Sequence, residues 1–224
     1  MGDAAASILD GCEESIEEAI WEEESDRTQG LATLAGIVER LRALDLEHDD
    51  GARLRRQGLL AMALMREANL HRQTGDLPAA AAADEAALSA AETADALSRG
   101  CCLLSMAGTR FASGDPDQGM LLLLEARRVF DPSAGPDHMQ GIGWSWLLEA
   151  DVANAGLMEG GPMEAVAAAA RALGILRPID NWAGIARVYE AMAAAEEKSG
   201  DAATAEGLAD IAARYQARAS AEHQ

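Results

Sequence analysis

Four glycine turns recur along the chain at a nearly constant spacing, and this repetition limits the folds that the sequence can adopt. They are Gly75-Asp76, Gly114-Asp115, Gly160-Gly161 and Gly200-Asp201, separated by 39, 46 and 40 residues. Glycine can end a helix in the left-handed conformation, and the residue after it can cap the next helix. Periods of this length indicate stacked supersecondary units. We therefore predict a series of helix hairpins, each with one of these turns between its two helices.

Small residues occupy the same three positions around all four turns. Alanine stands seven residues before each turn glycine, and a small residue stands five and twelve residues after it. The twelve positions hold Ala68, Ala107, Ala153 and Ala193, then Ala80, Gly119, Ala165 and Ala205, then Ala87, Ala126, Ala172 and Ala212. Packed helices approach closely only where a small side chain leaves room. Alanine is abundant in this chain, yet twelve matches of twelve exceed what its abundance explains.

The composition agrees with an all-helical protein and narrows the class of partner. Hydrophobic residues make up 49% of the 224 residues, enough for a sizeable core, while aromatic residues make up only 4%. The net charge of -20 argues against binding to nucleic acid or to an anionic membrane, because both draw on clusters of Lys and Arg. A protein or peptide partner that is neutral or basic fits this charge better.

The cysteines and the apolar segments indicate a cytoplasmic protein. Cys12, Cys101 and Cys102 cannot form a disulfide framework, since two are adjacent in a predicted helix. We interpret them as core residues rather than as a redox sensor. The longest apolar run, residues 120–124, is too short to cross a bilayer, and no basic segment followed by an apolar run opens the chain. Neither secretion nor membrane anchoring is expected.

The turns and the small residues around them resemble the tetratricopeptide repeat family over about residues 52 to 220. The period is longer than the usual one of about 34 and is similar to that of divergent arrays in bacterial regulators and adaptors. The resemblance implies an all-α, right-handed solenoid of about five antiparallel hairpins that binds proteins without catalysis. It also implies one continuous array of four hairpins over residues 51–224.

The first 50 residues are interpreted as a degenerate, acidic hairpin that caps the array. Apolar stripes at helical spacing run from Ile8 or Leu9 to Ile20 and from Leu31 to Leu41. Gly30 takes the place of the turn glycine. Terminal repeats are often atypical in this way.

A binding groove follows from the family resemblance, which places certain residues of each first helix on the concave side. The groove residues are Met65, Arg66, Asn69, Gln73, Ser105, Trp144, Asp151, Asn154, Arg187 and Glu190, with Met62 and Met158 beside them. Asn can bind a peptide backbone through donor and acceptor, Arg can bind a carboxylate through two hydrogen bonds, and Met adapts to uneven apolar surfaces. The methionines also suit an ordinary core.

Motifs for catalysis and cofactor binding are absent from the sequence. It has no phosphate-binding loop, no dinucleotide-binding glycine motif, no zinc-protease motif and no nucleophile elbow. Residues 47–50, Glu-His-Asp-Asp, are read as a loop in which Asp50 caps the next helix, rather than as a metal site. Asp137 is likewise expected to cap a helix. We therefore expect no enzyme activity, no cofactor and no metal.

Three alternatives stay open at this point. The chain could be a ligand-sensing module of a regulator, or a small helical enzyme with an unfamiliar site. The acidic residues 1–26, with ten Asp and Glu and no base, could serve as the docking surface in place of the groove. A homo-oligomer is also compatible with the sequence.

Overall fold

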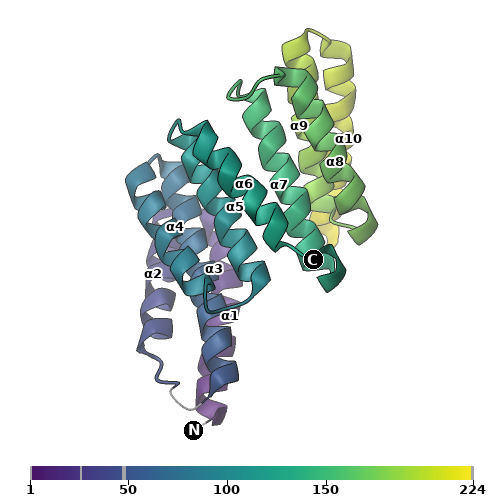
Figure 1. Cartoon of the computed structure of the whole chain (residues 1–224). Coiled ribbons are helices and arrows are strands. Elements are labelled where there is room, and N and C mark those ends of the chain that lie inside the picture. The colour runs from purple at the N-terminus through teal and green to yellow at the C-terminus, as the bar shows by residue number, and fades with distance from the viewer. Residues whose placement is uncertain (1, 26, 47–48, 223–224) are drawn as a thin grey trace. The chain divides into compact units, whose positions relative to one another are not determined.

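Residues 2–25, 27–46 and 49–222, which a computed structural model describes, form ten α-helices in five successive hairpins and no strand (Figure 1). The pairs are α1 (Gly2–Ser25) with α2 (Arg27–Ala43), α3 (Asp50–Thr74) with α4 (Leu77–Ala91), α5 (Ala96–Ala112) with α6 (Pro116–Val129), α7 (Pro136–Asn154) with α8 (Gly161–Leu176), and α9 (Trp182–Ser199) with α10 (Ala202–Glu222). Two 3-10 turns, η1 (Pro132–Ala134) and η2 (Arg177–Ile179), precede α7 and α9. The prediction of an all-α hairpin repeat is confirmed.

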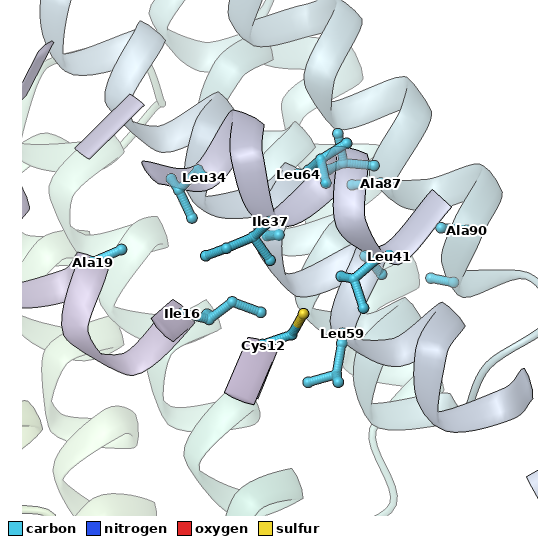
Figure 2. Close-up of a cluster of buried hydrophobic side chains, with 14 of the residues drawn as sticks. Cys12, Ile16, Ala19, Leu34, Ile37, Leu41, Leu59, Leu64, Ala87 and Ala90 are labelled. Atoms are coloured by element: carbon cyan, nitrogen blue, oxygen red, sulfur yellow. The ribbon is translucent and has the colours of Figure 1, made fainter. Parts of the chain in front are cut away.

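The helices fall into two compact units, residues 1–125 and 126–224. In the first unit α3 packs against α1, α2, α4 and α5. Figure 2 shows Cys12 and Ile16 of α1 near Ile37 and Leu41 of α2 and Leu59 of α3, and all five are buried. Their spacing along each helix places them on one face, as the apolar stripes predict.

The second unit is built on alanine-rich contacts. Its first helix, α7, packs against α8 and α9, and α9 packs against α8 and α10. Ala168, Ala169 and Ala172 of α8 are completely buried among larger residues such as Leu147 and Val188. The small side chains let α8 approach its neighbours closely, and the larger residues fill the remaining space.

Each of the last four hairpins has the same hydrogen-bonded glycine turn after its first helix. Gly75, Gly114, Gly156 and Gly200 have positive φ, and the amide of each donates to the carbonyl three residues earlier. The next amide donates to the carbonyl five residues before it, which completes a Schellman motif. In the hairpin of α7 and α8 the turn predicted from the sequence was therefore wrong. Gly156 ends the helix there, and Gly160 precedes the next one after a short loop.

Three smaller expectations about helix ends were also wrong. Gly30 is not a turn residue but lies buried inside α2. A glycine inside a helix lowers the stability of the helix but does not have to end it. The cap of α3 is Asp49, whose carboxylate accepts from the Ala52 amide, so Asp50 belongs to the first turn. Helix α7 begins after Gly135 without a side-chain cap, and Asp137 lies in its first turn.

The aligned small residues lie at helix contacts. Ten of the twelve are buried, and only Ala193 and Ala205 of the last hairpin are partly exposed. In the hairpin of α7 and α8 the small residues were aligned on Gly160, although Gly156 ends the helix, and the aligned positions are nevertheless buried. Ala153 packs against Ala165 of α8 and Ala195 of α9. Three helices thus meet at Ala153.

Replacing Ala153 with leucine is expected to destabilise the protein by about 1 to 3 kcal/mol, because the added atoms overpack this meeting point. Ala217→Leu is the control, since Ala217 is exposed on α10. Urea unfolding measures both free energies. Equal values for the two variants would show that α7, α8 and α9 do not meet closely at Ala153.

Among the described residues, no helix is both long enough and apolar enough to span a membrane.

Candidate functional site

A cluster of charged side chains joins the first helices of the last two hairpins. Arg187 of α9 binds Glu190 one turn later at 2.6 Å and Asp151 of α7 at 3.3 Å. All three side chains are 43 to 47% exposed. The neighbouring helices α7 and α9 bring these predicted groove residues together, although Asp151 is 36 residues from Arg187 in the sequence. The cluster carries two negative charges and one positive charge.

The charges of the cluster favour binding of a positively charged group over a negatively charged one. Burial raises the pKa of Asp151, an effect that the Arg187 guanidinium opposes and that Glu190 adds to. A second cation near Asp151 and Glu190 would therefore stabilise both carboxylates. An anionic ligand would instead have to displace two carboxylates from Arg187. The geometry suits a lysine or arginine side chain of a partner.

Asn154 also lies at this interface, but its side chain holds the helices together. Its amide nitrogen donates to the Ala191 carbonyl at 2.9 Å, and its backbone carbonyl accepts from Lys198. The Asn154 Oδ1 atom is buried and has no hydrogen-bond partner among the described residues. Trp144, on the same helix, packs partly buried against the core of the second unit. Met158 lies in the loop before α8.

The other predicted groove residues belong to the first unit and differ in exposure. Gln73 is exposed near the end of α3, while Met65, Arg66 and Asn69 are partly buried along the same helix. Met65 packs against the core, as the alternative interpretation of the methionines holds, whereas Met62 is 41% exposed. Ser105 of α5 is buried. The role of these residues in binding stays a prediction.

A buried polar network connects α3, α4 and α5. Arg72 donates to the Asn69 side chain at 2.8 Å, to the Ser105 carbonyl at 3.3 Å and to the Thr109 hydroxyl at 3.0 Å. The same hydroxyl donates to Asp84 at 2.6 Å. Thr109 thus bridges the partly buried Arg72 guanidinium and the buried Asp84 carboxyl group.

A glycine of α5 lies beside the Arg72 guanidinium. A Cβ atom at Gly108 would lie 3.4 Å from the central carbon of that group, at ordinary van der Waals distance. The sequence contained a signal for this network, because Asp84 follows a run of five alanines and lies at a core position of α4. Arg72 and Thr109 gave no such signal.

Asp84 makes the stability of the protein depend on pH. Burial raises the pKa of this carboxyl above its ordinary value of 3.8, although Thr109, Ser105, Arg72 and Arg110 oppose the shift. The native state therefore holds this proton more tightly than the unfolded state does. Its contribution to stability is fully present below the unfolded pKa and is lost as the pH rises through the native pKa.

For Asp84→Asn we expect a smaller fall in unfolding free energy than for the wild type as the pH rises from about 3.8. Asparagine can still accept from Thr109, so the fold should persist. Denaturation at a series of pH values provides the measurement, with the exposed Glu85→Gln as control. If the unfolding free energies of Asp84→Asn and the wild type changed in parallel with pH, the raised pKa of Asp84 would be contradicted.

A buried ion pair lies in the other unit and was not predicted. Arg127 contacts Glu149 at 2.6 Å, with the two side chains only 12% and 7% exposed. Arg127 also donates to the Ser145 hydroxyl and carbonyl, and its guanidinium lies 3.5 Å from the ring centre of Trp146. Burial lowers the pKa of Arg127, while Glu149 opposes that change. These contacts tie the end of α6 to α7.

The alternative metal and redox sites can be compared with the part of the chain described. No three His, Cys, Asp or Glu side chains there lie close enough to hold a metal ion. Glu47 and His48, half of the alternative metal site, lie outside the described residues. Cys102 is buried, and burial raises the pKa of its thiol to about 12, whereas a reactive cysteine needs a lowered pKa.

Comparisons with known proteins support the fold. No protein-family model matches the sequence, and no curated protein matches it. The crystal structure of BtubC (BKLC) from P. vanneervenii is similar, with a TM-score of 0.59 and 17% identity over 97% of this chain and 92% of that chain. A putative kinesin light chain of Podosopora anserina with nearly identical TPR-like repeats gives a TM-score of 0.52 at 17% identity, over 94% of this chain and 97% of that one. The chain therefore has the tetratricopeptide-like helical-repeat fold.

Proposed function

We propose that this protein is a non-catalytic scaffold or adaptor of the cytoplasm, which binds a neutral or basic segment of a protein partner. The binding surface is the exposed face of α7 and α9, the first helices of the last two hairpins. The observation that carries the proposal is the half-exposed cluster of Asp151, Arg187 and Glu190, formed by α7 and α9 together.

The chemistry of this cluster explains the preference for a basic segment. One guanidinium lies between two carboxylates, so the local net charge is negative. The carboxylate oxygens can accept further hydrogen bonds from a lysine or arginine of the partner. Exposed ion pairs of this kind contribute little to folding, about 0 to 1 kcal/mol each, so the cluster is of more use for recognition. The overall charge of -20 speeds the encounter with a basic partner.

Selection from a displayed library of random peptides tests this proposal on the full chain. We expect the wild-type chain to enrich sequences with Lys or Arg. The variant Asp151→Asn with Glu190→Gln should lose that enrichment, because it keeps the shape of the surface and removes its negative charge. Enrichment of acidic peptides, or the same peptides with both chains, would contradict the assignment.

A further inference from the structure

Arg187 already occupies the carboxylates that the proposed function assigns to a basic partner. Its two terminal nitrogens contact different acids, since Nη1 lies 2.6 Å from Glu190 Oε2 and Nη2 lies 3.3 Å from Asp151 Oδ2. The contact with Glu190 lies within α9, whereas the contact with Asp151 joins α9 to α7. A basic side chain of a partner therefore meets a site that holds a cation of its own.

The contact between Arg187 and Asp151 is the one that a partner can break. Hydrogen bonds between a guanidinium and a carboxylate are usually about 2.7 to 2.9 Å long, so 3.3 Å is a long contact and 2.6 Å is a short one. A basic side chain that approaches Asp151 repels the guanidinium, because both are positively charged. Glu190 holds that guanidinium through the shorter contact, so Asp151 can exchange one cation for another.

The Asp151 carboxylate stays compensated during such an exchange. Burial raises its pKa, the Arg187 guanidinium lowers it, and Glu190 raises it further, so a cation beside Asp151 stabilises its charged form. A lysine or arginine of the partner supplies the same compensation. Ion pairs as exposed as this one contribute little to folding, so the partner can break the contact of Arg187 with Asp151 at a small cost.

We propose that Arg187 is an internal competitor of the partner and thereby limits the affinity of the site for basic groups. A basic side chain of the partner takes the place of the Arg187 guanidinium at Asp151, while Arg187 stays bound to Glu190. The affinity is lowered by the fraction of molecules in which Asp151 is already occupied. A single free cation therefore binds poorly, and a segment that makes further contacts with the surface is favoured. This inference rests on the proposed function of the same cluster.

Titration calorimetry of the full chain with a basic peptide from the library selection measures the competition. The titrations are made at a pH of about 8, far above the ordinary carboxyl pKa of about 4. Arg187→Met should bind the peptide about three- to tenfold more tightly than the wild type, because Asp151 is then free. The matched control is Arg99→Met, which removes the same charge and breaks an ion pair with Glu125 in which both side chains are 47% exposed. It should change the affinity by less than about twofold.

A double variant shows whether the gain comes from Asp151. Arg187→Met with Asp151→Asn should lose the gain and bind no more tightly than the wild type. A gain that survives this change, an equal gain in Arg99→Met, or an Arg187→Met variant that binds no more tightly than the wild type would overturn the inference. The proposed function would still stand in these cases if Asp151→Asn with Glu190→Gln weakens binding. An unchanged affinity in that acidic variant would overturn both.

Discussion

Replacing Glu149 with alanine is expected to lower the free energy of unfolding by about 3 to 5 kcal/mol. The change leaves the Arg127 guanidinium buried without its anion, because that side chain is only 12% exposed. Its remaining contacts, with Ser145 and the Trp146 ring, are to neutral groups. A natural domain has a stability of about 5 to 15 kcal/mol, so the loss is a large part of the total. Urea unfolding followed by circular dichroism measures it.

The control for this prediction is an ion pair of the same residue types on the surface. Arg99 and Glu125 lie 2.9 Å apart, and both side chains are 47% exposed. Glu125→Ala should therefore cost no more than about 1 kcal/mol, because water solvates either charge when its partner is removed. If Glu149→Ala costs as little as Glu125→Ala, the ion pair of Arg127 is not buried as described.

The second large effect is expected at a glycine. Gly141→Ala should destabilise the protein by about 1 to 3 kcal/mol, although alanine favours a helix over glycine by about 1 kcal/mol. The new Cβ atom would lie 2.4 Å from the ring of Phe130. That ring is 4% exposed and packs edge-on against His138, so it has little freedom to move.

Gly174→Ala, in α8, is the matched control and should have the opposite sign. Its Cβ atom would meet nothing within 4 Å, so the helix preference acts alone and stabilises by about 1 kcal/mol. Thermal unfolding compares the two variants directly. A Gly141→Ala variant that melts above the wild type would show that α7 does not lie closely against the Phe130 ring.

The repeat pattern made most of the fold predictable from the sequence. Ending a helix needs a local device, a glycine in the left-handed conformation, and such devices are visible as residues at a fixed period. One error arose where two nearby glycines could each end the same helix. Gly156 and Gly160 both suit a helix end, and only the packing of α7 and α8 decides between them. Gly30 was wrongly assigned to a turn, because the sequence does not distinguish a glycine inside a helix from a glycine that ends one.

The candidate site was less predictable, because it depends on which helices become neighbours. The family resemblance selected Asp151, Arg187 and Glu190 one by one, but their ion pairs follow from the packing of α7 against α9. The buried networks were missed for a related reason. Arg72 and Arg127 look like ordinary surface residues in the sequence, and only the anions on neighbouring helices make their burial tolerable.

The central claim is that the α7 and α9 cluster binds a basic segment. Its most direct test is titration calorimetry with a basic peptide obtained from the library selection. The account predicts that Asp151→Asn with Glu190→Gln weakens binding to the full chain by about tenfold or more, which is about 1.4 kcal/mol. Glu206→Gln with Asp210→Asn removes the same charge from exposed positions of α10 and should change the affinity by less than about twofold. An equal loss of affinity in both variants would show a general effect of charge. An unchanged affinity in the Asp151→Asn with Glu190→Gln variant would place the binding surface elsewhere. Either result would contradict the account.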